Sequence, residues 1–201
     1  AESLLMASIA VGGGFADKVV AMTSSHFASS ERQYRFPLGY GGQRTPTAQW
    51  TVTGSGAALV CSDGKGPKIE SCTIGTVSDL GIKDANNMGA AMAPAAADTI
   101  TRHLTDTGRT AADYDLIITG DLGRVGHDIL MELMKERGHP LIFERYMDCG
   151  LQVFSPEQDV HAGGSGCGCS AIVLNSHILA RLKAGELQRV LFMATGALLS
   201  T

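Results

Sequence analysis

The sequence predicts a layered α/β fold, in which helices cover a largely buried β-sheet. Three observations support this prediction. Strand-like and helix-like segments alternate along most of the 201 residues, apolar residues make up 44% of the chain, and several of the 25 glycines directly follow a predicted helix. A chain of this length and apolar content can bury a substantial core.

The first part of the chain contains one predicted helix and two strand-like segments. Apolar residues at helical spacing predict a helix over 1–11, which the glycines at 12–14 end. The apolar, β-branched run 19–25 predicts a buried strand. Residues 31–46 read as a long loop punctuated by glycine and proline. Both ends of 49–63 favour strand, and glycine between them marks a close approach of another backbone or a ligand.

The middle of the chain alternates between strands and helices. Residues 68–81 and 114–119 predict strands. Residues 88–108 and 124–138 predict helices that end at glycine, and Pro94 lies near the start of the first. This alternation is the main reason to expect layers of helices on a sheet.

The last segments continue the same alternation. A loop includes 148–154, after which 170–185 predicts a helix and 189–199 a final strand. The chain begins within a helix-like segment and ends in a strand-like one, so we expect a piece of a longer protein, trimmed at both ends. Such a piece should expose sheet edges and apolar faces.

Composition excludes several classes of function. The formal net charge is −4 and the 16 basic residues are scattered, which argues against a nucleic-acid interface. No apolar run is long enough to span a bilayer. Five irregularly spaced cysteines predict reduced thiols rather than a disulfide framework. The sequence also lacks a GxSxG motif, a P-loop and a GxGxxG turn between a strand and a helix.

The stretch HAGGSGCGCS at 161–170 places several glycines directly before a predicted helix. Unpaired backbone N–H groups and the helix dipole at such a start favour an anion, so the stretch predicts a site for a carboxylate or a phosphate. The glycines are equally compatible with close packing of this loop against a neighbouring strand. The sequence leaves both interpretations open.

Cys167 and Cys169 in the same stretch allow three interpretations. The pair supplies two thiolates, but no second pair has the spacing of a zinc site. A thiol at a helix start has a lowered pKa, which allows a reactive cysteine. Because cysteine is among the most buried residue types, packing of a helix start against a sheet is the favoured interpretation.

A second candidate site is the turn that follows the 114–119 strand. Loops at the carboxyl ends of strands hold ligands in α/β sheets. Arg124 is predicted to face a ligand carboxylate there as a bidentate clamp. Asp121 suits a ligand contact or a cap for the following helix. His127 lies within that helix and is interpreted as a surface or packing residue.

Two further features lie near the first predicted strand. His26 directly follows it and is compatible with a base or a ligand contact, although a loop residue is the favoured interpretation. Arg32, Arg35 and Arg44 make the 31–46 loop basic. A solvated loop explains this charge, and contact with an acidic ligand or a partner subunit is the alternative.

Several segments together resemble the thiolase and ketoacyl-synthase superfamily. QWTVTGSGAALV resembles its glycine-rich strand, and YDLIITGDLGRVG resembles the strand and turn that carry its first catalytic histidine. HAGGSGCGCSAIVL resembles the loop and helix that carry the superfamily's second histidine or an asparagine. ATGAL resembles the glycine-rich strand near the superfamily's active site. The resemblance implies a partial thiolase-like layered α/β/α fold. Residues 1–66 would be the remainder of the N-terminal half and residues 67–201 the C-terminal half.

The chain departs from the catalytic pattern of that superfamily. The nucleophilic cysteine would lie before Ala1, at the start of the helix that the chain continues. The first histidine should fall near Gly120 or Asp121 and the second near Gly163 or Gly164, where no imidazole is present. Condensation needs a thiolate and groups that polarise a thioester carbonyl, so catalysis of that type is not expected. Glycine at these positions should also widen the old active site.

The motif order is similar to that of a thiolase-like sporulation family of endospore formers. This resemblance implies a protein that binds dipicolinic acid, with or without calcium, and supports its uptake into the forespore without a resident cofactor or metal. It further implies a homodimer at the forespore inner membrane, with membrane partners from the same operon, no transmembrane segment and no nucleic-acid partner.

The resemblance also implies where the diacid would bind. One carboxylate would lie on the amides of 163–168, and Arg124 or a loop arginine would take the other. The implied ligand-binding residues are His26, Gly120, Asp121, Arg124, His161, Gly163, Gly164 and Ser165.

Two other classes of function remain open at this point. The first is an acyltransferase or condensing enzyme that uses an upstream cysteine, with His26 or His161 as an unorthodox base. The second is a purely structural subunit in which the degenerate pocket is closed.

Overall fold

The structure, a computed structural model, describes residues 1–28 and 45–197. Its elements follow the chain in the order α1 (Glu2–Gly12), β1 (Lys18–Ser25), β2 (Trp50–Thr51), β3 (Gly54–Cys61), α3 (Met88–Thr107), η1 (Ala111–Asp113), β4 (Leu116–Thr119), α4 (Gly123–Glu136), η2 (Phe143–Arg145), β5 (Tyr146–Asp148), η3 (Cys149–Leu151), η4 (Pro156–Gln158), β6 (Gly164–Ser165), α5 (Cys167–Val173), η5 (Leu174–Ile178), α6 (Leu179–Ala184) and β7 (Val190–Met193).

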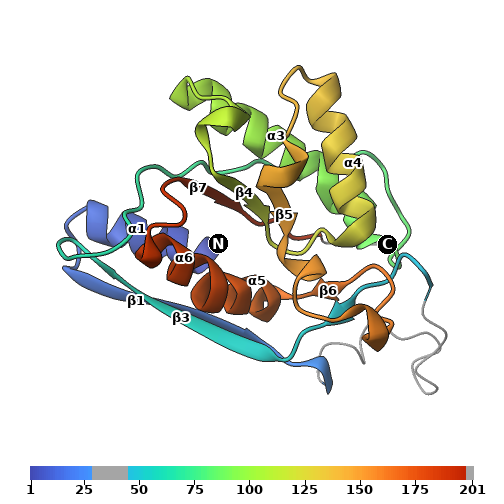
Figure 1. The fold of residues 1–201 in the computed structure, drawn as a ribbon, viewed down its shortest axis with the longest axis horizontal. Helices are drawn as coiled ribbons and strands as arrows, with labels where there is room; N and C mark the ends of the chain where they lie inside the picture. The colour runs from blue at the N-terminus through green and yellow to red at the C-terminus, as the bar shows by residue number, and fades with distance from the viewer. Residues whose placement is uncertain (29–44, 198–201) are drawn as a thin grey trace.

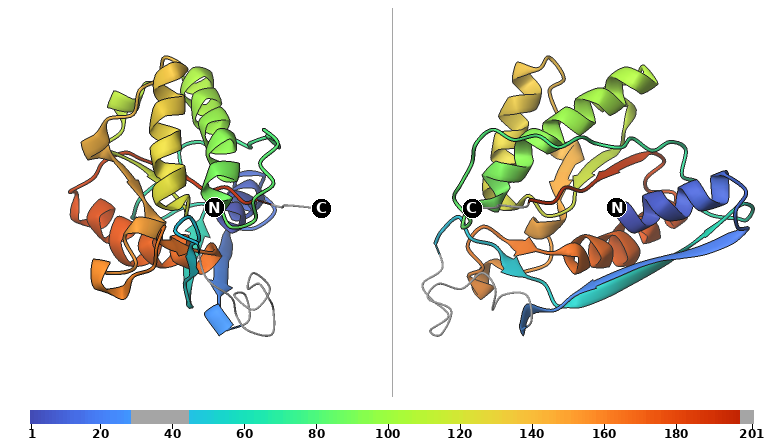
Figure 2. Two further views of the ribbon diagram at one scale, coloured as in Figure 1. Left: turned by 90° about the vertical axis from the view of Figure 1, so that its right-hand side faces the viewer. Right: turned by 180° about the vertical axis from the view of Figure 1, so that it is seen from behind.

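These elements form stacked layers (Figure 1). Helices α3 and α4 lie on one face of the three-stranded sheet β5-β4-β7, while α1, α5 and α6 lie between that sheet and the antiparallel pair β1–β3. The same order of layers is visible from behind in Figure 2. Elements from both sides of residue 66 pack together, since β1 and β3 both contact α5. The layered α/β prediction is confirmed.

The central strand of the three-stranded sheet is β4, which pairs in parallel with β5 and β7. All four residues of β4 are buried, as expected for a strand that helices cover on both faces. The predicted strands in 114–119 and 189–199 are confirmed as β4 and β7. Strand β5 has only three residues and was not predicted, because such a short segment carries no recognisable pattern.

Helices α3 and α4 confirm the predictions for 88–108 and 124–138. The Asn87 side chain accepts a hydrogen bond from the N–H of Ala90 at the start of α3, and Gly108 ends this helix with φ +64°. The two helices touch at Gly89 and Gly126, where a Cβ on Gly89 would lie 2.7 Å from the amide nitrogen of Gly126. Alanines and leucines of α3 and α4 fill the core above the sheet.

The predicted strand over 68–81 is wrong, because this segment has no regular secondary structure. It runs along α3 and is held there by side-chain hydrogen bonds rather than by backbone pairing. Glu70 bonds Arg109 (3.0 Å), and Thr73 bonds Nδ1 of the buried His103 (2.8 Å). Alternating β-branched residues indicated a strand, but a strand also needs a neighbour with free backbone groups.

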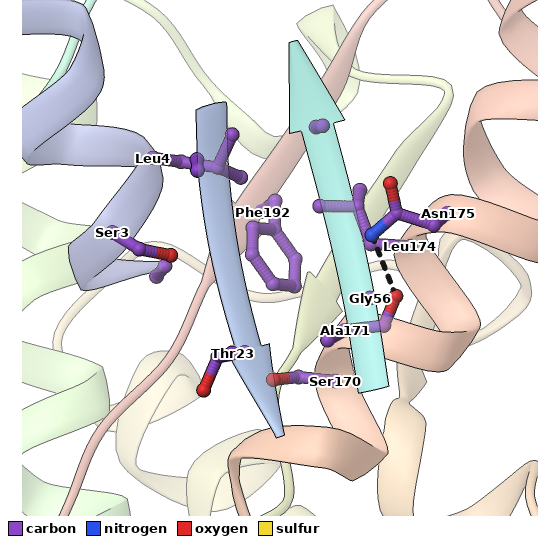
Figure 3. Close-up of a pocket in the computed structure, with 12 residues that line it drawn as sticks. Ser3, Leu4, Thr23, Gly56, Ser170, Ala171, Leu174, Asn175 and Phe192 are labelled. Carbon is purple, nitrogen blue, oxygen red and sulfur yellow. Dashed lines mark hydrogen bonds between the residues drawn. The ribbon is translucent and has the colours of Figure 1, made fainter. Parts of the chain in front are cut away.

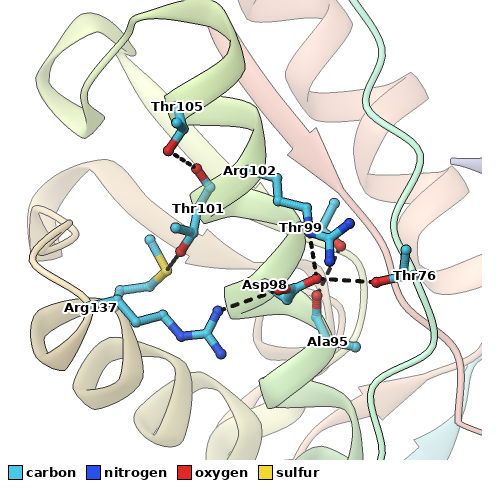
Figure 4. A network of polar contacts seen from close by, with 9 residues as sticks. Thr76, Ala95, Asp98, Thr99, Thr101, Arg102, Thr105 and Arg137 are labelled. Carbon is cyan, nitrogen blue, oxygen red and sulfur yellow. Dashed lines mark hydrogen bonds and ion pairs between the residues drawn. The ribbon is translucent and has the colours of Figure 1, made fainter.

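A polar network fixes the same segment and α4 against α3 (Figure 4). Asp98 on α3 pairs with Arg102 on its own helix (3.0 Å) and with Arg137 at the end of α4 (3.9 Å). The Asp98 carboxylate also accepts a hydrogen bond from the Thr76 hydroxyl (3.3 Å). One carboxylate therefore links the two helices and the extended segment at the protein surface.

Strands β1 and β3 form an antiparallel pair that confirms two predicted strands. The prediction that 19–25 is a buried strand is wrong in its burial, because only Ala21 of β1 is buried. One face of the pair packs on α5. A Cβ on Gly56 would lie 2.8 Å from the carbonyl oxygen of Ala171, and one on Gly54 would collide with the Ile172 side chain. Glycine in this strand therefore does mark the close approach of another element, as the sequence predicted.

The predicted helix over 170–185 is present but starts earlier and is not uniform. It begins at Cys167, changes to a π-helical turn over Leu174–Ile178, and ends at Gly185 with φ +77°. Buried residues of α5 and the π-helical turn form a second core with β4.

Helix α1 confirms the prediction for 1–11, and it is apolar on nearly all sides although only Ala7 is buried. Large apolar side chains are exposed on α1, just after it, and on the outer face of β1–β3. They are Met6, Ile9, Phe15, Val20, Met22 and Leu59. The expected exposure of apolar faces is therefore confirmed.

Candidate functional site

The carboxyl ends of β4, β5 and β7 meet at one edge of the sheet, where α/β proteins place ligands. Gly120 and Asp121 follow β4, Cys149 follows β5, and Ala194 follows β7. The loop over 161–166 lies against the same edge, because the N–H of Arg124 donates to the carbonyl of Ala162 (2.8 Å). The structure therefore brings the two predicted site segments together.

A buried carboxylate, Asp148, organises this edge. One of its oxygens accepts from the Thr119 hydroxyl (2.6 Å) and the N–H of Leu122 (2.8 Å). The other accepts from the N–H groups of Gly123 and Gly150, both at 3.0 Å. Burial raises the pKa of Asp148, and these donors oppose that effect by stabilising the charged form.

Asp148 also caps α4, which corrects the prediction for Asp121. Helix α4 follows Leu122, which makes no side-chain cap, and its first amides are bonded to Asp148 from the neighbouring strand. The sequence missed Asp148 because its partners lie 25 and 26 residues away in the chain. A lone aspartate between a methionine and a cysteine gives no local signal for this role.

Asp121 instead reaches across to the glycine-rich loop. Its carboxylate accepts a hydrogen bond from the N–H of Gly166 (2.7 Å). Two other amides of the loop are also bonded within the protein, since Gly168 donates to the Ser25 hydroxyl (2.9 Å) and Gly163 to the carbonyl of Val160 (3.1 Å). The expectation that these three amides are free for a ligand anion is therefore wrong. A carboxylate of the protein itself occupies the place predicted for a ligand carboxylate.

Gln49 is a further residue that the sequence did not single out. Its side-chain N–H₂ group donates to the carbonyls of Asp121 (2.7 Å) and Gly164 (2.9 Å). The adjacent strand β2 pairs in parallel with β6, with Trp50 opposite Gly164. Gln49 therefore joins the turn after β4 to the glycine-rich loop, and the two segments form one rigid unit.

Burial raises the pKa of Asp121 from its ordinary value of 3.8 to about 6. The N–H of Gly166 and the Ser165 hydroxyl favour the charged form, whereas burial and the negative charge of Asp148 outweigh them. Because the folded protein holds this proton more tightly than the unfolded chain, Asp121 contributes most to stability below its ordinary pKa. That contribution is lost as the pH rises toward about 6.

Asp121→Asn should therefore raise the free energy of unfolding by about 1–3 kcal/mol at neutral pH. The amide oxygen can still accept the Gly166 hydrogen bond, while the buried charge is removed. The stability of the wild type should decline as the pH rises from the ordinary pKa of 3.8 to about 6, and this decline should be smaller in the variant. Urea denaturation at a series of pH values measures both effects.

The matched control for this variant is Asp63→Asn, which removes an exposed carboxylate. Its free energy of unfolding should stay within about 0.5 kcal/mol of that of the wild type. If the free energy of unfolding of Asp121→Asn followed that of the wild type in parallel at every pH, the pKa of Asp121 would not be raised by burial.

Glycines at the positions of the superfamily's histidines do not widen the site, which corrects another prediction. A Cβ on Gly120 would lie 2.9 Å from the Ala194 Cβ. One on Gly163 would lie 2.7 Å from the carbonyl oxygen of Gly150, and one on Gly164 would lie 3.0 Å from a methyl group of Val52. Neighbouring atoms fill the space, so close packing explains these glycines.

The histidines of this region do not point to acid–base chemistry at the sheet edge. His26 is exposed, and its Nδ1 accepts from the N–H of Ala28 (3.2 Å). His161 is also exposed, with φ +54°, and its Nδ1 donates to the carbonyl of Thr45 (2.8 Å). His127 stacks on Tyr146 with ring centroids 4.6 Å apart, which confirms its interpretation as a packing residue.

All five cysteines are free. Cys149 and Cys169 are fully buried, and burial raises the pKa of both thiols. The packing interpretation is therefore confirmed for Cys169. Cys167 is exposed, and its thiol donates to the carbonyl of Ser24 (3.0 Å). Arg32, Arg35 and most of the 31–46 loop, Arg44 included, lie outside the described residues.

Arg124 lies at the rim of a cleft of about 310 Å³ between α4, η2, β5 and η3. The residue is exposed, and its guanidinium makes no hydrogen bond or ion pair within residues 1–28 and 45–197. The rings of His127, Phe143 and Tyr146 line the same cleft. Of the predicted site residues, Arg124 is the one that combines a charge with an adjoining cavity.

A second, much smaller cavity of about 20 Å³ lies between α1, the β1–β3 pair, α5 and β7 (Figure 3). Ser3, Thr23, Ser170 and Phe192 point toward it, and the Asn175 side chain beside it donates to the carbonyl of Ala171 (2.8 Å). This volume fits about one water molecule and is far below that of a small-molecule site.

Two further features of the described part of the chain concern metal binding and membrane insertion. Across residues 1–28 and 45–197, no three His, Cys, Asp or Glu side chains converge to hold a metal ion. No helix within the same ranges has the length and apolar character needed to cross a bilayer.

Comparison with solved structures supports the thiolase-like fold. The tetronic acid condensing enzyme AbyA1 matches with a TM-score of 0.60, at 17% sequence identity, over 97% of this chain and 60% of that enzyme's chain. At this identity the likeness shows a shared fold only.

Comparison with curated and family sequences is more specific. The chain is 54% identical over 199 residues to the Stage V sporulation protein AD of Bacillus subtilis (strain 168), across 99% of this chain. It spans 59% of the length of that relative. The family described as Stage V sporulation protein AD (SpoVAD) matches residues 1–201. The chain is therefore a member of the SpoVAD family and has a thiolase-like fold.

Proposed function

We propose that the full-length protein binds dipicolinic acid and supports its uptake into the forespore, on a thiolase-like scaffold that does not catalyse condensation. The single observation that carries this proposal is Arg124. Its guanidinium has no partner among the described residues and borders a cleft of about 310 Å³. An unpaired guanidinium beside aromatic rings suits a small planar carboxylate, because it can bind the carboxylate in a bidentate manner.

The packing at the former catalytic positions supports a binding role over acyl transfer. Gly120 and Gly164 are closely packed by neighbouring residues, so the positions that need an imidazole have no room for one. The exposed His26 and His161 are each bonded to a nearby backbone group. Among residues 1–28 and 45–197, no histidine at the sheet edge is thus placed to act as a base toward a thioester.

The proposal extends to the assembly in which the protein works. We propose a homodimer, peripheral at the forespore inner membrane, that acts with membrane partners from the same sporulation operon. The exposed apolar side chains on α1 and β1–β3 are compatible with such contacts. The ligand would bind with or without calcium, and the protein would hold no resident metal.

Arg124→Gln in the full-length protein should weaken dipicolinate binding at least about tenfold, which corresponds to about 1.4 kcal/mol. The substitution removes the charge and the bidentate donor geometry while it keeps a polar side chain. Isothermal titration calorimetry, with and without calcium, measures the affinity of the wild type and the variant.

The matched control is Lys183→Gln, which removes an exposed positive charge on α6. Its affinity should equal that of the wild type. Absence of saturable dipicolinate binding by the wild-type protein would overturn the proposed function. Turnover of an acyl-CoA that is lost in His161→Ala would instead favour the acyltransferase alternative.

A further inference from the structure

The extended segment 68–81 lies on α3 without any backbone pairing. Within the described part of the chain, no N–H or carbonyl group of this segment bonds to another backbone group. Its apolar side chains are largely exposed, Val77 by 98%. The bonds that hold it come from the side chains of Glu70, Thr73 and Thr76, and Figure 4 shows Thr76 reaching α3. A segment held in this way can leave the surface while the helix and the sheet beneath it stay folded.

The contact made by Thr73 ends at a buried histidine. His103 on α3 is only 5% exposed, and its Nδ1 bonds the Thr73 hydroxyl (2.8 Å). Its Nε2 bonds the hydroxyl of the buried Tyr114, also at 2.8 Å. A neutral imidazole has one N–H group and one lone pair, so it can bond both hydroxyls at once. Both partners are uncharged, so neither stabilises an imidazolium as a carboxylate would.

The charged groups around His103 strengthen its preference for the neutral form. Burial, and then the nearby Arg109, lower the pKa of His103 below its ordinary value of 6.5, while Asp106 on α3 opposes them. Glu70 of the segment is bonded to Arg109 (3.0 Å). This bond lowers the pKa of Glu70 below its ordinary value of 4.5. His103 can therefore take up a proton under mildly acidic conditions while the Glu70 contact remains charged.

We propose that residues 68–81 form a pH-sensitive strap that His103 controls. The strap stays on α3 while His103 is neutral, and it is released when the ring takes up a proton from solvent. Because the closed strap lowers the pKa of His103, closure is most favourable above pH 6.5 and weakens as the pH falls below it. One proton changes the ratio of closed to open strap by at most about tenfold per pH unit. None of these residues lines the cleft at Arg124, so the strap does not depend on the proposed ligand.

Limited proteolysis of the full-length protein tests the strap. Glutamyl endopeptidase cleaves after glutamate at neutral and at mildly acidic pH, and the chain around Glu70 must leave α3 before the protease can bind it. Glu157, in the exposed turn η4, provides a reference site in the same sample. Mass spectrometry measures the ratio of cleavage after Glu70 to cleavage after Glu157. This ratio should rise at least about fivefold between about pH 7.5 and about pH 5.5.

Three variants assign the effect to His103. His103→Gln keeps a donor and an acceptor but does not titrate, so the change of the cleavage ratio with pH should disappear. Thr73→Val removes the bond to His103 from the side of the strap, and should raise the ratio at about pH 7.5. His177→Gln is the matched control, since His177 is an exposed histidine in the π-helical turn, and it should keep the pH dependence of the wild type. Circular dichroism shows whether each variant is folded.

Each contrary result overturns a stated part of the proposal. A cleavage ratio that stays constant with pH in the wild type would overturn the pH-sensitive strap. An equal rise in His103→Gln would show that another group titrates, and would overturn the role of His103. If that variant does not fold, a ratio for Thr73→Val no higher than that of the wild type at about pH 7.5 would overturn the same role. Absence of cleavage after Glu70 at both pH values, with Glu157 cleaved, would overturn release of the strap.

Discussion

Asp148→Ala is expected to lower the free energy of unfolding by at least about 4 kcal/mol. The substitution leaves the N–H groups of Leu122, Gly123 and Gly150 without an acceptor in a buried site. The Thr119 hydroxyl loses its bond to Asp148 and keeps only its bond to the Tyr146 hydroxyl. Each unsatisfied buried donor costs about 1–3 kcal/mol, partly offset by the removal of a buried charge. Urea denaturation monitored by circular dichroism measures the change.

Asp148→Asn refines this test. The asparagine has one side-chain oxygen, which can accept hydrogen bonds from only two of the four donors. Its N–H₂ group would face the other two donors and cannot accept from them. An intermediate loss is therefore expected, about half that of the alanine variant. Asp63→Ala, which removes an exposed carboxylate, should change stability by less than about 0.5 kcal/mol. A loss for Asp148→Ala that is as small as that of the control would disprove the structural role.

The same carboxylate has a consequence for ligand binding. Asp148 fixes where α4 starts, and Arg124 lies in the first turn of α4. The position of the guanidinium therefore depends on a buried residue of a neighbouring strand. Arg124 is also tied to the glycine-rich loop through its own N–H, which donates to Ala162. Changes to this edge of the sheet should therefore affect both stability and the Arg124 site.

Gly163→Ala is expected to cost about 3–5 kcal/mol of folding stability. Gly163 has φ +109°, a backbone conformation that other residues rarely adopt. A Cβ there would also lie 2.7 Å from the carbonyl oxygen of Gly150, which is backbone and cannot rotate away. Thermal and urea denaturation of the variant beside the wild type measure the loss.

The control for this variant is Gly12→Ala at the end of α1. A Cβ at Gly12 has no atom within 4 Å, and the backbone there is not left-handed. This substitution should be neutral or slightly stabilising. A similar stability for both variants would mean that the loop around Gly163 is not packed as the structure describes.

The close packing around these glycines contradicts the expected widening of the site. An enlarged hollow would have left room for a ligand between the turn after β4 and the glycine-rich loop. Instead, Asp121 and Gln49 bridge the two segments directly. The ligand site proposed here therefore lies beside this unit, in the cleft at Arg124, and not between its two segments.

Much of the secondary structure and the family resemblance could be predicted from residue patterns alone. Helix α3 was predictable because its apolar spacing, its early proline and its terminal glycine all indicate the same element. Strand β4 was predictable because a short apolar, β-branched run leads into a glycine turn. The glycines of β3 correctly indicated a close neighbour. These signals are local, so they are readable without knowledge of the fold.

Local patterns could not predict which groups meet at the site, because these groups lie far apart in the sequence. The bond between Asp121 and Gly166 joins residues 45 positions apart, and the bond between Gln49 and Gly164 joins residues 115 apart. The segment 68–81 has the pattern of a strand but lies along α3 without a pairing partner. Hydrogen-bond partners depend on which surfaces the folded chain brings within about 3 Å of each other. Residue type alone cannot specify that distance, because the same carboxylate can cap a helix, bind a loop or bind a ligand.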